Sequence, residues 1–185
     1  NCDYGYENDC LCYAPICFLE GTPINTDQGK IPIEKINTLT NTIRNKKIIA
    51  ITRTISPMDY LVCIEANALG NLIPSEEVII SPNHKIFYPY LRTMIDAKEL
   101  LYTNNPKIYA VEYYKEILYN VLLETHEKMI VNNLIVETLN PSNVVAQIYL
   151  GNFSPYKREY LIKTFNSFIK TGSKYELKKL IKYFY

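Results

Sequence analysis

The chain has 185 residues, 48% of them hydrophobic and 21% charged, with a formal net charge of +1. These values are close to those of globular domains and exclude a wholly disordered chain, while the near-neutral charge offers no general attraction for nucleic acid or a membrane surface. No run of about 18 apolar residues is present to cross a bilayer, so the composition predicts one folded domain with an appendage.

Residues 1–16 form an acidic, tyrosine-rich leader without hydrophobic periodicity. This leader lacks the apolar core of a signal peptide, so we expect it to be the end of a preceding region. It contains Cys2, Cys10 and Cys12, and Cys17 follows directly after it. The cysteine spacing matches no familiar zinc site and no histidine lies nearby, so free thiols are favoured over a disulfide, and a disulfide over a metal site.

Residues 17–140 contain short runs rich in β-branched and aromatic residues, separated by Asn, Gly and Pro. Such runs are typical of closely spaced β-strands. The predicted strands include Lys47–Thr54, Tyr60–Ile64, Glu77–Ile80, Lys107–Val111, Leu118–Leu123, Met129–Val131 and Leu134–Thr138. Asn132-Asn133 is expected to form a tight hairpin turn, because asparagine tolerates a positive φ, and Cys63 is expected to be a small buried hydrophobe. The pattern predicts a compact, mainly β domain.

Residues 141–185 change to helical periodicity. Ser154-Pro155 is a predicted N-cap followed by the first helical residue, and Gly172 is a predicted helix end. Ser173-Lys174-Tyr175-Glu176 has the form of a capping box for a second helix. The apolar residues at helical spacing are Tyr156, Tyr160, Leu161, Phe165, Phe168 and Ile169 in the first helix, and Leu177, Leu180, Ile181 and Phe184 in the second. This pattern predicts a C-terminal helical hairpin as an appendage.

The predicted hairpin is strongly basic. Between Lys157 and Lys182 it has eight basic residues and two acidic ones. A solvated polar face on an amphipathic helix pair explains this excess most simply, and an acidic partner or a membrane surface is the alternative.

A specific order of residue types begins at Cys17. Two apolar residues and a Gly21-Thr22 turn follow it, then a strand-like Ile24-Asn25-Thr26, a second glycine turn, and Ile33-Glu34-Lys35-Ile36. A cysteine at the start of such a block is a candidate nucleophile, provided that the chain also supplies a base or acid and a polarising group.

Two further motifs follow in the chain. Ser81-Pro82-Asn83-His84 comes directly after an apolar strand, and a predicted hairpin starts with Tyr119-Asn120-Val121 and turns at Val131-Asn132-Asn133. The ordered set resembles the Hint domain, the autoprocessing module shared by hedgehog proteins and inteins, with Ser81 in place of the family's threonine. The resemblance implies a Hint-type compact all-β fold over 17–140. The helical hairpin has no counterpart in the minimal family fold.

The resemblance also implies an activity on the chain itself. In the family the cysteine attacks its own preceding peptide bond, which here is Ile16–Cys17. Cys17 would be the nucleophile of an N-to-S acyl shift, His84 would polarise or protonate the departing Cys17 nitrogen, and Ser81 would organise the scissile peptide. Water, a thiol or an alcohol would then take the acyl group from the thioester. The resemblance implies no cofactor and no metal, and the partner of the reaction is the chain's own N-terminal segment.

The sequence departs from the family pattern at several positions. Splicing inteins end in His-Asn before a nucleophile, whereas this chain has Glu137-Thr138, and its next asparagine, Asn140, precedes a proline. We therefore expect no protein splicing. Hedgehog proteins use an aspartate to activate cholesterol, and Thr52 aligns roughly with it, so sterol transfer is not expected. Thr52 and His126 are candidates for an assisting role, although His126 is expected to be structural or exposed.

Two other functions are compatible with the same residues. A degenerate Hint fold could serve as a structural or interaction module with the basic helices as its contact surface, and the crowding of β-branched Ile16 beside its carbonyl favours this alternative. A cysteine hydrolase that uses Cys17 and His84 in trans is a third hypothesis, although the familiar local signatures of cysteine proteases are missing.

Overall fold

The computed structural model describes residues 16–184. The rest of the predicted leader, with its three cysteines, lies outside them. The strands are β1 (Pro23–Thr26), β2 (Gly29–Pro32), β3 (Thr42–Ile43), β4 (Lys46–Thr54), β5 (Tyr60–Ile64), β6 (Val78–Ile80), β7 (Lys85–Tyr88), β8 (Thr93–Asp96), β9 (Ile108–Glu112), β10 (Leu118–Leu123), β11 (Lys128–Val131) and β12 (Leu134–Glu137). The helices are α1 (Val144–Leu150), α2 (Pro155–Thr171) and α3 (Lys174–Phe184), with 3-10 turns at Ile33–Lys35 and Ala97–Thr103. The prediction of a mainly β fold with C-terminal helices is confirmed.

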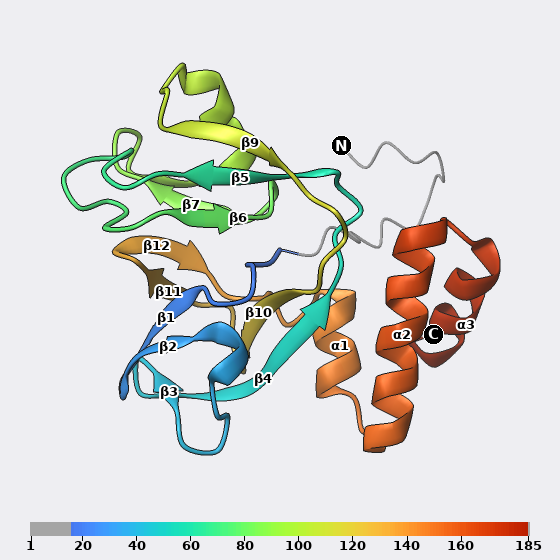
Figure 1. Ribbon diagram of the computed structural model, residues 1–185. Coiled ribbons are helices and arrows are strands. Elements are labelled where there is room, and N and C mark those ends of the chain that lie inside the picture. The colour runs from blue at the N-terminus through green and yellow to red at the C-terminus, as the bar shows by residue number, and fades with distance from the viewer. Residues whose placement is uncertain (1–15, 185) are drawn as a thin grey trace.

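The strands form small antiparallel sheets in the orders β1-β2, β10-β4-β3, β11-β12-β7-β8 and β6-β5-β9. Figure 1 shows β5, β6, β7 and β9 in one group and β1–β4 with β10–β12 in another. The pairing of β12 with β7 joins the two groups. Phe18 joins them again, because it bridges Ile80 at the end of β6 and Tyr119 in β10. The segment that follows Cys17 therefore lies at the junction of the two groups.

The predicted strands agree with the observed ones to within one or two residues, and the predicted hairpin turn is present. Asn132 and Asn133 have φ values of 46° and 64°, the left-handed conformation that a tight turn needs. β7 and β8 were not among the predicted strands. They are four residues each and mix charged with apolar side chains, so neither has a clear alternation.

The predicted helix ends are observed, together with a helix that the sequence pattern did not indicate. Ser154 accepts a hydrogen bond from the backbone N–H of Lys157 at 3.2 Å, and Gly172 ends α2 with a φ of 65°. The unexpected helix, α1, has only seven residues and is capped by the Asn143 side chain. Tyr156, predicted to belong to the apolar face of α2, is 85% exposed, because it lies in the first turn, before the part of α2 where the buried residues lie.

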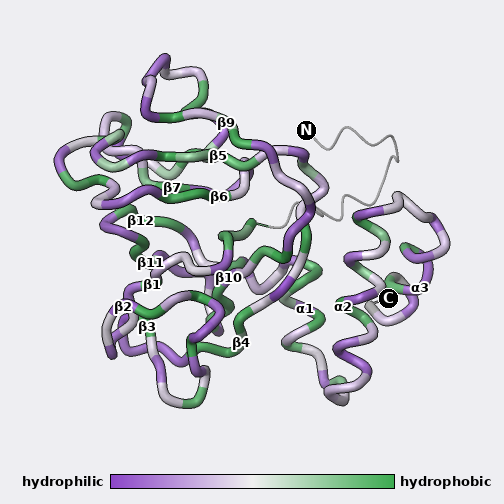
Figure 2. The backbone as a smooth tube through the Cα atoms, in the orientation of Figure 1, coloured by the Kyte–Doolittle hydropathy of each residue, from purple (hydrophilic) through white to green (hydrophobic). Residues whose placement is uncertain are grey.

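Two main apolar clusters stabilise this arrangement. The larger lies between the strands and includes Phe18, Ile24 and Ile86. The second joins Leu122 of β10 and Leu139 to the inner faces of the helices. Figure 1 shows α1 beside β4 and α2 next to α1, with α3 packed on α2. Figure 2 shows hydrophobic and hydrophilic residues alternating along α2 and α3, as expected for helices with one buried face. Among the described residues, no helix is long and apolar enough to cross a membrane.

Candidate active site

Cys17 lies at the junction of the strand groups and is only 2% exposed. Its backbone N–H donates to Ser81 Oγ at 2.8 Å, and its carbonyl accepts from the Ser81 N–H at 3.0 Å. Ser81 follows β6 directly, so the bridge between Phe18 and Ile80 places its backbone and hydroxyl against Cys17. These two hydrogen bonds fix the nitrogen side of the Ile16–Cys17 peptide bond.

The carbonyl side of the same peptide bond is held by Asn120. Its Nδ2 donates to the Ile16 carbonyl oxygen. The backbone N–H of Val121 donates to Asn120 Oδ1 at 2.7 Å, and this contact orients the carboxamide with its NH₂ group toward Ile16. Asn120 is fully buried in β10. A donor in this position can stabilise negative charge that develops on the Ile16 oxygen.

The Cys17 thiol contacts the hydroxyl of Thr54 at the end of β4. Cys17 Sγ and Thr54 Oγ1 are 3.5 Å apart. Around the thiol lie Leu61, Tyr113 and Leu118. Burial in this apolar environment raises the pKa of the Cys17 thiol to about 12, although the hydrogen bond with Thr54 lowers it. The thiol is therefore protonated at neutral pH and needs a base before it can attack.

His84 is fully buried beside Cys17 and Phe18, with 4.5 Å between the centroids of the His84 and Phe18 rings. Nε2 lies 2.9 Å from the carbonyl oxygen of Glu137. A carbonyl only accepts, so the network assigns the proton to Nε2 and leaves Nδ1 as an acceptor. Burial lowers the pKa of His84 to about 4, against the opposing effects of the Glu137 and Cys17 backbones. Within residues 16–184, Nδ1 accepts no hydrogen bond and remains able to take a proton.

Three of the predicted site residues, Cys17, Ser81 and His84, come together in the structure with Ile16. Two members of the site were not predicted to take part, Thr54 and Asn120. Asn120 belongs to the third motif, and Thr54 lies on the same buried face of β4 as the predicted Thr52. Thr52 pairs with Asn120 and lies 3.5 Å from its carbonyl oxygen. The alternation of side chains along a strand was the signal that could have indicated Thr54.

Comparison with known proteins assigns this arrangement to a family. Residues 16–143 match the family described as the Hint domain. The chain belongs to the Hint domain family. The resemblance inferred from the three sequence motifs is thereby confirmed.

Several solved inteins are similar to this Hint domain. The DnaB intein from Synechocystis sp. PCC 6803 is 12% identical, with a TM-score of 0.44, and the alignment covers 68% of this chain and 99% of that one. The Ssp DnaB mini-intein variant M86 is 14% identical, with a TM-score of 0.42 and coverage of 66% and 94%. A splice-inactive variant of the AceL NrdHF class 3 split intein is 13% identical, with a TM-score of 0.36 and coverage of 66% and 96%. No curated protein matches the chain.

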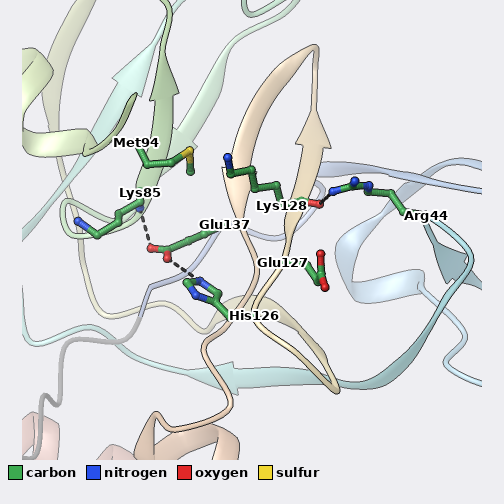
Figure 3. Close-up of a pocket in the computed structure, with 7 residues that line it drawn as sticks. All are labelled: Arg44, Lys85, Met94, His126, Glu127, Lys128 and Glu137. Carbon is green, nitrogen blue, oxygen red and sulfur yellow. Dashed lines mark hydrogen bonds and ion pairs between the residues drawn. The ribbon is translucent and has the colours of Figure 1, made fainter. Parts of the chain in front are cut away.

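A pocket of about 250 Å³ borders Glu137. The Glu137 carboxylate accepts from the backbone N–H of Lys85 at 2.9 Å and contacts His126 Nε2 at 2.8 Å, as Figure 3 shows. The pocket is lined by Arg44, Lys85, Met94, His126, Glu127, Lys128 and Glu137. His126 is exposed, as expected, and its side chain contacts Glu137 rather than the scissile peptide. Glu137 therefore links the two histidines of the Hint domain through its backbone on one side and its carboxylate on the other.

Proposed function

We propose that this Hint domain cleaves its own Ile16–Cys17 peptide bond by an N-to-S acyl shift. The observation that supports this most directly is that the peptide is held at both ends, at its oxygen by Asn120 and at its N–H by Ser81, beside the thiol of Cys17. Such positioning makes the attack intramolecular and can lower the barrier by ~7–11 kcal/mol. Oxyanion stabilisation by Asn120 adds to this, because the donor points to the atom on which charge develops.

The protons lost and gained in this acyl shift give His84 a specific role. When Cys17 Sγ bonds to the Ile16 carbonyl carbon, the thiol loses one proton, and when the C–N bond breaks, the Cys17 nitrogen gains one. A neutral His84 can accept the first proton at Nδ1 and deliver it to the nitrogen, so no outside acid is required. General acid–base transfer of this kind contributes roughly 10²–10⁴-fold in rate. The pKa of about 4 makes the protonated imidazole a strong acid toward the departing amine, but it also makes neutral His84 a weak base toward a thiol with a pKa of about 12. The main role of His84 in this proposal is therefore to donate the proton to the Cys17 nitrogen.

The product of the shift is a thioester between Ile16 and Cys17, which a second nucleophile must resolve. We expect release to water, a thiol or an alcohol rather than splicing. Thr138 stands at the position of the family's terminal asparagine and is buried, with its hydroxyl accepting from the Glu127 N–H at 2.9 Å. The next residue, Leu139, has no nucleophilic side chain and packs in the helix cluster.

The test is the intact mass of the purified chain before and after incubation with dithiothreitol. The wild type should yield a fragment that begins at Cys17, at a rate independent of protein concentration. Cys17→Ala should stay intact. Cys63→Ala is the matched control, since Cys63 is also a buried thiol in a strand and its removal should leave cleavage unchanged. An intact wild type under all thiol concentrations contradicts the proposed cleavage.

One observation favours a second function, that of a non-catalytic structural or interaction module. The site is closed to solvent, since Cys17, Ser81, His84 and Asn120 are all almost fully buried, and the raised pKa of Cys17 keeps its thiol protonated. Under this alternative, Cys17→Ala changes packing alone. The same burial disfavours a hydrolase that acts in trans, because such an enzyme needs an accessible nucleophile.

A further inference from the structure

The helices outside the Hint domain match also contact the site, and they do so at the edge of β4. One edge of β4 pairs with β10, and on the other edge Lys46 and Lys47 pair with β3. No other strand of the described part of the chain pairs with this second edge. The backbone N–H of Arg53 donates to the Tyr149 hydroxyl of α1 at 3.1 Å. The N–H of Ile55 donates to Asn166 Oδ1 of α2 at 3.1 Å. Two helix side chains thus take the place of a neighbouring strand.

These two hydrogen bonds flank Thr54, the residue whose hydroxyl contacts the Cys17 thiol. Arg53 and Ile55 present their N–H groups to the helices, while Thr54 between them pairs with Leu118 of β10. An extended backbone held at residues on both sides has little freedom at the residue between them. The helix contacts at Arg53 and Ile55, together with the pairing of Thr54 with β10, therefore restrain the position of the Thr54 side chain.

The same helical layer reaches the other side of the scissile bond. Ile16 packs against the apolar cluster that α1, α2 and α3 form with Leu122 and Leu139. Ile16, which carries the acyl group, and the Thr54 hydroxyl beside the Cys17 thiol are thus both positioned by contacts to the same helical layer. Figure 1 shows this layer as α1 and α2 alongside β4.

We propose that α1 and α2 form a positioning layer of the cleavage site, in which Tyr149 and Asn166 fix the β4 edge so that Thr54 stays against the Cys17 thiol. This inference rests on the proposed function and gives the helices a role in it. Tyr149 and Asn166 are positioning residues, because they act on the thiol through Thr54 and do not touch the reacting atoms themselves.

The test compares two buried cysteines in one chain. Cys17 lies next to the proposed positioning contacts, whereas Cys63 in β5 contacts Glu77 instead. Alkylation by iodoacetamide is followed at each cysteine by peptide mass, together with the rate of dithiothreitol cleavage. The variants are Asn166→Ala and Tyr149→Phe, which remove one acceptor each, and Asn166→Asp, which keeps an acceptor oxygen. Thr171→Ala, an exposed position on α2, is the control.

We expect Asn166→Ala and Tyr149→Phe to raise the ratio of Cys17 to Cys63 alkylation about fivefold and to slow cleavage by a similar factor, as the loss of one buried hydrogen bond predicts. Asn166→Asp and Thr171→Ala should leave both quantities near wild type. The inference is overturned if alkylation rises equally at both cysteines or at neither. It is also overturned if the wild type cleaves and a variant changes the ratio of Cys17 to Cys63 alkylation without changing the cleavage rate. If the wild type does not cleave and the ratio still rises, the positioning layer stands and the proposed cleavage fails.

Discussion

The Asn120 carboxamide has one orientation in this site, because its oxygen is occupied by the Val121 N–H and its nitrogen by the Ile16 carbonyl. A shorter side chain would leave the Ile16 oxygen without a donor at the moment when it becomes an oxyanion. The proposed cleavage thus gives Asn120 a chemical role as well as a place in the strand.

We expect Asn120→Ala to slow dithiothreitol-dependent cleavage by about 10²–10³-fold, the effect typical of losing one oxyanion donor. The measurement is the single-turnover rate from intact mass. Asn83→Ala is the control, since the Asn83 side chain accepts from Lys98 Nζ and lies in the loop that contains Ser81 and His84. Equal rates for Asn120→Ala and the wild type would remove Asn120 from the mechanism.

The burial of His84 predicts that the stability of the folded chain depends on pH, whether or not the chain cleaves itself. Burial lowers the pKa of His84 from 6.5 to about 4. Between these two pH values, His84 binds a proton in the unfolded chain but not in the folded chain. The contribution to stability is therefore present above pH 6.5 and is lost as the pH falls toward 4. The loss reaches about 3 kcal/mol, from 1.36 kcal/mol per pKa unit.

The measurement is the free energy of unfolding in urea from pH 7 to pH 4, in a Cys17→Ala chain that cannot cleave. Adding His84→Asn should make the free energy of unfolding less dependent on pH than it is in Cys17→Ala alone. Adding His126→Asn, which removes the exposed histidine, should change it much less. Identical slopes with and without His84 would show that the imidazole is not held neutral by burial.

At the scale of elements, prediction from sequence succeeded where burial and local pattern agree. β10 was predicted at both ends, because all six of its residues are buried and its run is continuously apolar apart from Tyr119-Asn120. α2 was predicted from its cap and its glycine end. α1 was missed because seven residues starting with two valines resemble a strand. Its stability comes from packing against β4 and Leu139, which is information that no local pattern contains.

Cys17, Ser81 and His84 were predicted as site residues from their motifs, whereas Asn120, which lies in a motif, and Thr54, which does not, were not predicted to take part. Thr54 follows Thr52 by two residues, and only the register of β4 against β10 and the placement of Cys17 show which threonine meets the thiol. Contacts of this kind depend on three-dimensional pairing of distant segments. Spacing along the chain can place Thr52 and Thr54 on one face of β4, but it cannot show which of the two meets the thiol.

The hairpin turn between β11 and β12 gives a prediction at this scale. Asn133 has a φ of 64°, a conformation that costs a residue with a plain Cβ roughly 1–2 kcal/mol. Asn133→Ala should therefore lower the free energy of unfolding of the Cys17→Ala chain by about 1 kcal/mol. Asn133→Gly should be more stable than Asn133→Ala, because glycine adopts this φ freely and both variants lose the hydrogen bond from Asn133 Nδ2 to the Leu72 carbonyl. An unchanged stability for Asn133→Ala would contradict a left-handed turn.

At the scale of the whole molecule, the proposed cleavage site lies where the two strand groups meet, and Phe18 connects both of them directly after Cys17. A new chain end at Cys17 would thus arise inside the folded body rather than on a loop. Cleavage there would convert a buried peptide N–H into a buried α-amino group, still next to Ser81 Oγ.

That change predicts a pH-dependent loss of stability in the cleaved product. An α-amino group has a pKa of about 7.7–8.0 in an unfolded chain, and burial disfavours its charged form. The unfolded chain therefore binds a proton below about pH 8 that the folded chain resists, so stability falls as the pH decreases through this range. Unfolding of the chain that begins at Cys17 should be compared with uncleaved Cys17→Ala at pH 9 and pH 6. The cleaved chain should be the less stable one at pH 6, and the difference in free energy of unfolding between the two chains should be smaller at pH 9. An equal difference in free energy of unfolding at both pH values would mean that the new amine reaches solvent, and that Cys17 leaves its buried position once the bond is cut.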